Sequence, residues 1–264
     1  AIAYYNKQGD EKKAKEKLER AFTLDQTDAR VFLELDQLYK KTGVKVEDRL
    51  QKYEEHKELI KERDDLYTEY VTVLNLAGKH KEAYEAVMAH QFRPWEGAEG
   101  RITAQYKTAL LEMAKEDVYR GAYYDAGTKI KKAMEYPENL GEGRLEGTKD
   151  NHLYYWLGLV QKALGHEEEA VKCWEKALLG AQEPAGMLYY YDQPADMILY
   201  QGMAAQKLGD EMEGNSRFYS LIDYGEKHVY DKVKTDYFAV SHPDFLIFED
   251  DLDKRNKAHC YYLM

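Results

Sequence analysis

The chain has 264 residues, of which 33% are charged and 44% are hydrophobic, a composition typical of folded rather than disordered proteins. Its net charge of −11 disfavours nucleic acid as a partner, because an acidic surface repels phosphates. No apolar run reaches the ~20 residues of a membrane-spanning helix, and the first residues lack the layout of a signal peptide. We therefore expect no membrane partner and a cytoplasmic location.

Two cysteines, Cys173 and Cys260, are too few and too far apart for a disulfide framework or a zinc knuckle. Cys173 lies beside Trp174 on an expected packing face, where a thiol acts as a small apolar group. The sequence therefore predicts neither a metal site nor a cofactor.

Residues 1–89 have the pattern of regular helix pairs. A glycine follows an amphipathic run and precedes a charged helix start at Gly9, Gly43 and Gly78, with spacings of 34 and 35 residues. Glycine suits the tight or left-handed connection between two antiparallel helices. The second pair is less regular, because Arg49 occupies a position where a small residue is usual.

Residues 90–225 continue the pattern with a longer repeat, and the turn glycine recurs every 43 or 44 residues. In the clearest unit, residues 152–177, small residues such as Gly158 and Ala170 allow two helices to approach, and Trp174 fills the gap between them. In the last unit, Gly214 stands where alanine is usual. That glycine should cost about 1 kcal/mol of helix stability unless close packing requires it.

The order of large and small positions in residues 152–177 resembles the tetratricopeptide repeat, a helix-turn-helix unit with a period of ~34 residues. This resemblance implies an all-α, right-handed α-α superhelix of about six helix pairs, with residues 1–264 forming one solenoid. Residues 226–264 depart from the pattern. We expect a helix over residues 228–240 and another that begins near Asp251.

Three long insertions follow the second helices of the third, fourth and fifth units, at residues 90–100, 136–148 and 181–194. Insertions at equivalent repeat positions project from the same edge of a solenoid. Aromatic rings with carboxylates and an amide suit sugar hydroxyls or a basic peptide, although the same rings can fold back onto the helices. The expected binding surface, the loop edge, comprises Arg93, Trp95, Glu96, Glu99, Glu138, Asn139, Glu142, Tyr190 and Asp192.

The segments FRPWEGAEG, YPENLGEGR, YYYDQPADM and FEDDLDKRNKAHCYYLM resemble the C-terminal repeat region of a bacterial family of uncharacterised function. Proteins of that family carry a β-sandwich domain, similar to carbohydrate-related domains, ahead of the repeats. The resemblance extends from Asp48 to the end of the chain. It implies an N-terminal β-sandwich domain in the parent chain and a link to carbohydrate metabolism.

A second candidate surface is the groove that first helices line in a solenoid. The repeat register places polar and aromatic residues there, but not the Lys, Asn and Arg cluster with which chaperone-binding relatives clamp a C-terminal carboxylate. The expected groove residues are Thr72, Asn75, Lys115, Tyr119, His152 and Tyr155.

Catalytic motifs are not evident. The glycines of residues 141–147 miss the dinucleotide-binding spacing and follow a helix, and neither a zincin motif nor a nucleophile elbow occurs. Glu96 and Glu99 could perform acid–base chemistry on a glycosidic bond, but no nucleophile, base and orienting group come together. We therefore predict no catalytic residue and no enzymatic activity.

The sequence instead predicts an interaction scaffold for a protein, a peptide or a neighbouring domain of its parent chain. The alternative is a carbohydrate-binding or glycosidase-assisting module that uses the loop edge. Both ends of the chain cut across repeats, which predicts self-association or capping by further residues. The apolar residues expected to be exposed there are Ile2, Tyr5, Tyr261 and Leu263.

Overall fold

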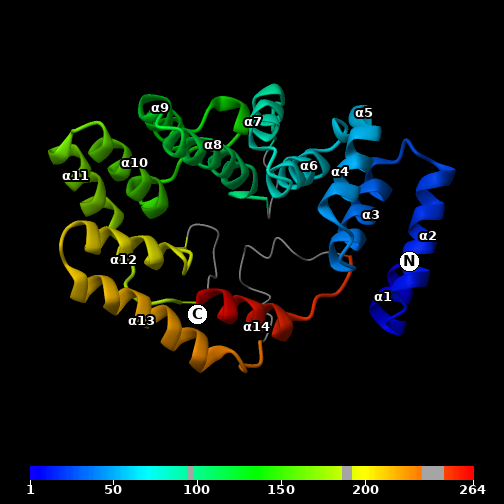
Figure 1. Cartoon of the computed structure of the whole chain (residues 1–264). Helices are drawn as coiled ribbons and strands as arrows, with labels where there is room; N and C mark the ends of the chain where they lie inside the picture. The colour runs from blue at the N-terminus through cyan, green and yellow to red at the C-terminus, as the bar shows by residue number, and fades with distance from the viewer. Residues whose placement is uncertain (94–97, 186–191, 234–246) are drawn as a thin grey trace. The chain divides into compact units, whose positions relative to one another are not determined.

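The computed structural model describes residues 1–93, 98–185, 192–233 and 247–264, which form α-helices, one short 3-10 helix and no β-strand (Figure 1). This confirms the predicted all-α fold. In the described residues, consecutive helices follow one another as six pairs, with a four-residue helix after the second pair and a last helix after the sixth. The elements are α1 (Ile2–Gln8), α2 (Glu11–Leu24), α3 (Ala29–Lys41), α4 (Val46–Glu55), α5 (Lys57–Ile60), α6 (Asp64–Leu76), α7 (His80–Ala89), α8 (Arg101–Tyr119), α9 (Tyr123–Ala133), η1 (Glu138–Leu140), α10 (Asn151–Ala163), α11 (Glu167–Ala177), α12 (Met197–Lys207), α13 (Glu211–His228) and α14 (Leu252–Leu263).

The predicted turn glycines have the backbone conformation that the pattern requires. Gly165 connects α10 to α11 with φ of 80°, and Gly209 connects α12 to α13 with φ of 90°. These angles lie in the left-handed region, where a Cβ atom is strained. The four other turn glycines of the series also have positive φ: Gly9, Gly43, Gly78 and Gly121.

The helices form two compact units. The first contains residues 1–109, 138–141 and 247–250, and the second contains the remaining described residues. Within the first unit, α2 packs against α3 and α6 packs against α7. The unusual Arg49 of α4 is 3% exposed and makes a bidentate ion pair with Asp36 of α3, at 2.8 and 2.7 Å. The position that the sequence marks as irregular is therefore a buried ion pair.

The second unit shows why its helix pairs need small residues. In α10, a Cβ atom at Gly158 would lie 2.3 Å from the indole nitrogen of Trp174 in α11. In the next pair, a Cβ atom at Gly202 or Gly214 would lie 3.0 or 2.9 Å from the backbone carbonyl oxygen of the other glycine. Close packing of α12 on α13 therefore requires a glycine at position 214, as the sequence analysis allowed.

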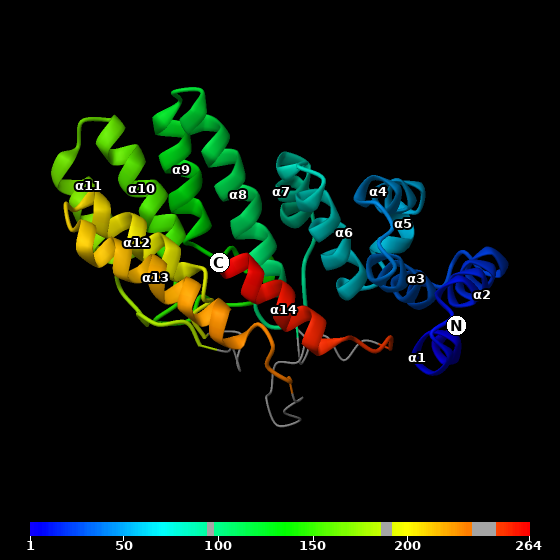
Figure 2. The same cartoon turned by 60° about the horizontal axis from the view of Figure 1, so that its bottom comes forward.

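The last helix, α14, packs against α13 (Figure 2). A Cβ atom at Gly225 of α13 would lie 2.8 Å from the carbonyl oxygen of Cys260 in α14. Leu263 is only 8% exposed, because it packs with Ile198, Leu221 and Tyr224. The predicted exposure of Leu263 is therefore wrong, whereas Ile2 and Tyr261 are 43% and 56% exposed.

The helix predicted to begin near Asp251 is confirmed as α14. The helix predicted over residues 228–240 is wrong at its start, because α13 runs through to His228 and residues 229–233 are not helical. The rest of that prediction falls on residues 234–246, outside the described part.

Candidate functional site

Part of the predicted loop edge lies outside the residues that the structure describes. Trp95, Glu96 and Tyr190 are not among the described residues. Arg93, Glu99, Glu138 and Asn139 belong to the first unit, whereas Glu142 and Asp192 belong to the second. Their convergence on one surface remains a prediction.

The side chain of Asn139 serves the packing of its own insertion. Its amide nitrogen donates hydrogen bonds to the carbonyl oxygens of Val87 at 2.8 Å and His90 at 2.9 Å. Its backbone carbonyl accepts a hydrogen bond from the backbone N–H of Phe92 at 2.8 Å. Asn139 therefore ties the second insertion to the end of α7 and the start of the first insertion.

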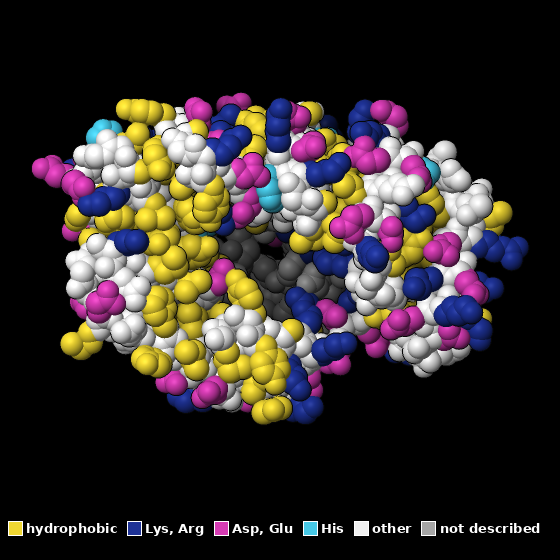
Figure 3. All heavy atoms as spheres, in the orientation of Figure 1, with side chains coloured by type: hydrophobic (Ala, Val, Ile, Leu, Met, Phe, Trp, Pro, Cys, Tyr) yellow, Lys and Arg dark blue, Asp and Glu magenta, His cyan; other side chains and the backbone are white. Residues whose placement is uncertain are grey.

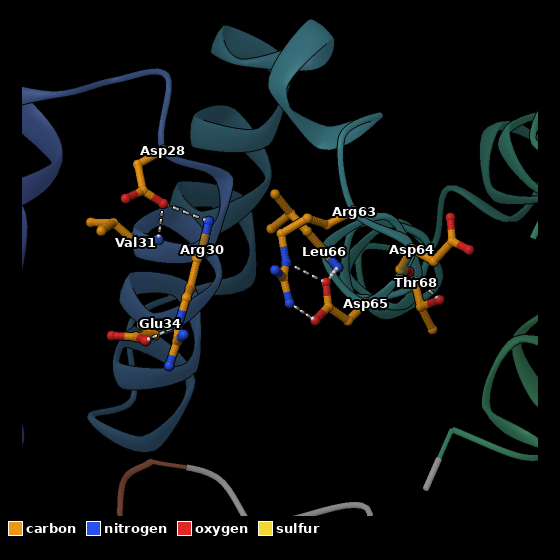
Figure 4. A network of polar contacts seen from close by, with 9 residues as sticks. All are labelled: Asp28, Arg30, Val31, Glu34, Arg63, Asp64, Asp65, Leu66 and Thr68. Carbon is orange, nitrogen blue, oxygen red and sulfur yellow. Dashed lines mark hydrogen bonds and ion pairs between the residues drawn. The ribbon is translucent and has the colours of Figure 1, made fainter. Parts of the chain in front are cut away.

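Arg93 borders a polar cavity of about 590 Å³ in the first unit. His90 Nε2 lies 2.7 Å from Asp64, whose other carboxylate oxygen accepts the backbone N–H of Arg93. Arg63 forms a bidentate pair with Asp65 beside them (Figure 4). Because these charges satisfy one another, the cavity has no evident preference for a ligand charge. Its lining residues are Lys61, Glu62, Arg63, Asp64, Asp65, His90, Gln91 and Arg93.

Two of the expected groove residues lie in the first unit and take part in packing. The hydroxyl of Thr72 donates to the backbone carbonyl of Thr68, one turn earlier in α6. Asn75 is 8% exposed and donates to the backbone and side-chain oxygens of Gln105, both at 3.0 Å. These contacts leave little of Asn75 for a ligand.

The other four expected groove residues meet in the second unit, where rings contact one another across three helices. Tyr119 of α8 packs edge-on to Trp156 of α10, with centroids 6.4 Å apart. Trp156 contacts Tyr155, and Tyr155 contacts Tyr200 of α12 at 6.2 and 6.0 Å. His152 also contacts Tyr200, at 5.9 Å. This series of ring contacts connects α8, α10 and α12.

The outer part of this series is accessible to a partner. Tyr119 is 80% exposed and Trp156 is partly exposed, whereas Tyr155 is buried and supports them from below. Figure 3 shows hydrophobic side chains gathered over α10 and α12. We call this surface the aromatic face and define it by the residues Tyr119, His152, Trp156, Leu199, Tyr200 and Tyr262.

The charges at the aromatic face are unevenly paired. Lys115 of α8 lies over the ring of Trp156, 5.5 Å from its centroid, and pairs with Glu112 at 2.6 Å. Burial raises the pKa of Tyr200 to about 12, and the charge of Asp196 adds to that rise. Burial also raises the pKa of Asp196 itself above its ordinary value. A cation that is already paired, Lys115, therefore lies beside the face, and the carboxylate of Asp196 at the start of α12 is partly dehydrated.

The sequence analysis named Lys115, Tyr119, His152 and Tyr155 as groove residues, and it did not name Trp156 and Tyr200, whose rings contact them. The prediction placed Tyr155 in the groove, whereas its neighbour Trp156 is the more exposed ring. Helical spacing was the signal that could have indicated these two rings. His152 and Trp156 are four residues apart, as are Asp196 and Tyr200, and residues at that spacing share one face of a helix.

The aromatic face offers rings, hydroxyl groups and charges rather than a reacting constellation. Within the described residues, no group of three or more His, Cys, Asp or Glu side chains is placed to hold a metal ion. None of the helices in that part of the chain combines the length and the apolar character needed to cross a bilayer.

No protein-family model matches the chain. Among solved structures, the crystal structure of MamA is 14% identical, with a TM-score of 0.27, and the match covers 83% of this chain and 91% of MamA. A tetratricopeptide repeat protein from Parabacteroides merdae is 12% identical, with a TM-score of 0.31, and the match covers 96% of this chain and 93% of that protein. Both TM-scores are low, so neither structure carries an argument about function.

Proposed function

We propose that the chain is a non-catalytic scaffold that binds a peptide segment of a partner protein on the aromatic face. The observation that carries this proposal is the series of ring contacts from Tyr119 to Trp156, from Trp156 to the buried Tyr155, and from Tyr155 to Tyr200. Tyrosine and tryptophan are enriched where proteins bind one another, because a large apolar ring carries a polar tip. Exposed aromatic side chains that adjoin one another mark an interaction surface better than scattered ones.

The form of the surface favours a peptide over a small ligand. The rings come from the first helices of three successive helix pairs, so an occupant must be long enough to touch α8, α10 and α12 together. Lys115 and Glu112, at the α8 side, supply a donor and an acceptor beside the apolar rings. A few aromatic anchors with polar groups at the margin are the usual composition of a binding hot spot.

A phage-displayed library of random 12-residue peptides tests the proposal. Peptides selected on the wild-type chain are synthesised, and their affinity is measured by calorimetry. Trp156→Ala and Tyr119→Ala should each weaken binding at least tenfold, as expected for an aromatic hot spot. Tyr219→Ala is the matched control, because Tyr219 is also an exposed tyrosine, at 65%, but lies on α13 outside the aromatic face.

Two results would contradict the proposal. One is a library that yields no peptide sensitive to Trp156→Ala. The other is binding of hexasaccharides, such as maltohexaose or chitohexaose, that is lost in variants of the insertions and kept in Trp156→Ala. That second result would favour the carbohydrate-binding module.

A further inference from the structure

Residues 247–250, which we call the strap, form a short non-helical segment that belongs to the first unit. Figure 1 shows the strap in red, close to α3. Phe248 is its apolar anchor. The ring is 1% exposed and packs edge-on to Tyr5 of α1, with centroids 5.4 Å apart. A side chain from the last part of the sequence is thus buried against the first helix.

The side-chain amide of Asn6 holds the strap by its backbone. Its Nδ2 donates a hydrogen bond to the carbonyl oxygen of Ile247 at 2.8 Å, and its Oδ1 accepts the backbone N–H of Glu249 at 3.0 Å. One amide therefore satisfies the backbone acceptor and the backbone donor on the two sides of Phe248. This contact fixes the position of the anchor without depending on the side chains of its neighbours.

Two lysines of the first unit pair with the two acidic residues of the strap. Lys7 of α1 lies 3.0 Å from Glu249, and both side chains are exposed. Lys41, the last residue of α3, lies 3.1 Å from Asp250, and its side chain is only 9% exposed. A shielded ammonium group depends on a carboxylate more than an exposed one does, because burial removes its hydration. Lys41 therefore gives the site its preference for an acidic residue.

These contacts have the composition of short-peptide recognition. Four consecutive residues supply a buried aromatic anchor, a backbone contact and paired charges at the margin. Three of the receiving side chains come from α1, a helix without a buried residue of its own. We call the receiving surface the strap site and define it by the residues Tyr5, Asn6, Lys7 and Lys41.

We propose that the strap site is a second protein-binding site, and that the strap occupies it until a partner segment displaces it. The partner segment carries a phenylalanine followed by two acidic residues, because a segment of that chemistry can make the same contacts as the strap. The strap is tethered and so competes at a high effective concentration, which keeps a free segment weakly bound while the strap is in place. This inference does not depend on the proposed function, because no residue of the strap site belongs to the aromatic face.

A tetrapeptide with the sequence of the strap, IFED, tests the site on the full chain. It is labelled with fluorescein, and its affinity for wild type and for Phe248→Ala is measured by fluorescence anisotropy. We expect Phe248→Ala to bind the peptide about tenfold more tightly than wild type, because a strap without its anchor no longer competes. The peptides IAED and IFQN, which lack the ring and the two carboxylates respectively, should bind about tenfold more weakly than IFED.

Further variants separate the site from an effect on folding. The double variant Glu249→Gln with Asp250→Asn retains the buried anchor, and it should also bind IFED more tightly than wild type. It decides the question if Phe248→Ala does not fold. In either background, Lys41→Gln should weaken the binding of IFED about tenfold, because the peptide loses its charge-assisted contact. Lys12→Gln is the matched control, because it removes the same charge from an exposed lysine of α2.

Three results would overturn the inference. The first is that IFED binds the strap variants no more tightly than wild type. The second is equal affinity for IFED and IFQN, or binding that Lys41→Gln leaves unchanged. The third is a wild-type dimer, seen by sedimentation velocity, that Phe248→Ala dissociates, because the strap would then dock on a second copy of the chain. Trp156→Ala should leave the binding of IFED unchanged, so this inference and the proposed function fail separately.

Discussion

The contact between Gly202 and Gly214 makes a quantitative prediction about the pairing of α12 and α13. In Gly214→Ala, the new methyl group would lie 2.9 Å from the carbonyl oxygen of Gly202 and 2.7 Å from Cγ of Gln206. The glutamine side chain can rotate away. The backbone oxygen cannot, so the two helices must separate by a few tenths of an ångström to reach an ordinary carbon–oxygen distance of about 3.3 Å.

Two terms of opposite sign set the size of the effect. Overpacking a well-packed contact costs about 1–3 kcal/mol, and replacing a helical glycine by alanine returns about 1 kcal/mol. The net expectation is a loss of about 1 kcal/mol, which lowers the melting temperature by roughly 2–4 °C in a chain of this size. Gly202→Ala acts on the same interface, where its methyl group would lie 2.4 Å from the Phe218 ring.

Thermal unfolding followed by circular dichroism measures these changes. Gly127→Ala is the matched control, because its methyl group meets only Val160 Cγ1, at 3.3 Å, so that variant should be neutral or slightly more stable. The double variant at Gly202 and Gly214 should lose less stability than the two single losses added together, since one separation of the helices relieves both contacts. If Gly214→Ala is as stable as Gly127→Ala, the argument from close packing is wrong.

Three further predictions concern polar side chains that are buried or partly buried. Arg49→Met should lower the free energy of unfolding in urea by about 3–5 kcal/mol because it leaves the Asp36 carboxylate buried and unpaired, and Arg49→Met with Asp36→Leu should recover most of that loss. Asn139→Ala should cost about 1–3 kcal/mol through its lost hydrogen bonds without weakening peptide binding, so a selective binding defect would contradict its packing role. Asp196→Asn should be more stable than wild type at neutral pH, because burial raises the folded-state pKa of Asp196 despite the opposing hydrogen bond from its own backbone N–H and the opposing charge of His259. The wild type therefore loses stability as the pH rises from 3.8, the ordinary pKa of an aspartate, through the raised pKa of folded Asp196. Tyr200 and Tyr262 stay uncharged over this range. If the melting temperatures of Asp196→Asn and wild type do not move apart between pH 3 and 8, this prediction is wrong.

The helix pairs were predictable because their signals are local. A turn glycine acts through its own backbone angle, and the pairing of Gly158 with Trp174 involves residues within one hairpin. Arg49 shows the limit of such reasoning. Its mismatch with the repeat was visible in the sequence, but its partner Asp36 lies on the preceding helix and became evident only from the fold.

The candidate site was only partly predictable for a related reason. Aromatic residues at helical spacing either pack between helices or face outward. A shift of one residue along the helix changes which of the two occurs. Tyr155 and Trp156 are adjacent in the sequence, yet the first is buried and the second is partly exposed. The contact between Tyr155 and Tyr200 joins α10 to α12, and periodicity within one helix cannot predict it.

The cost of burying Asp196 is itself informative about its role. An aspartate whose purpose is to cap a helix gains stability from the backbone N–H that it accepts, as Asp210 does at the start of α13. Asp196 makes no such capping bond, and the hydrogen bond from its own backbone N–H does not offset the burial that raises its pKa, so a neutral residue such as asparagine would suit the isolated fold better. The carboxylate of Asp196 is therefore not explained by capping of α12. The net charge of −11 would attract a partner segment that contains basic residues, whereas contacts with the rings of the aromatic face would set how slowly the complex dissociates.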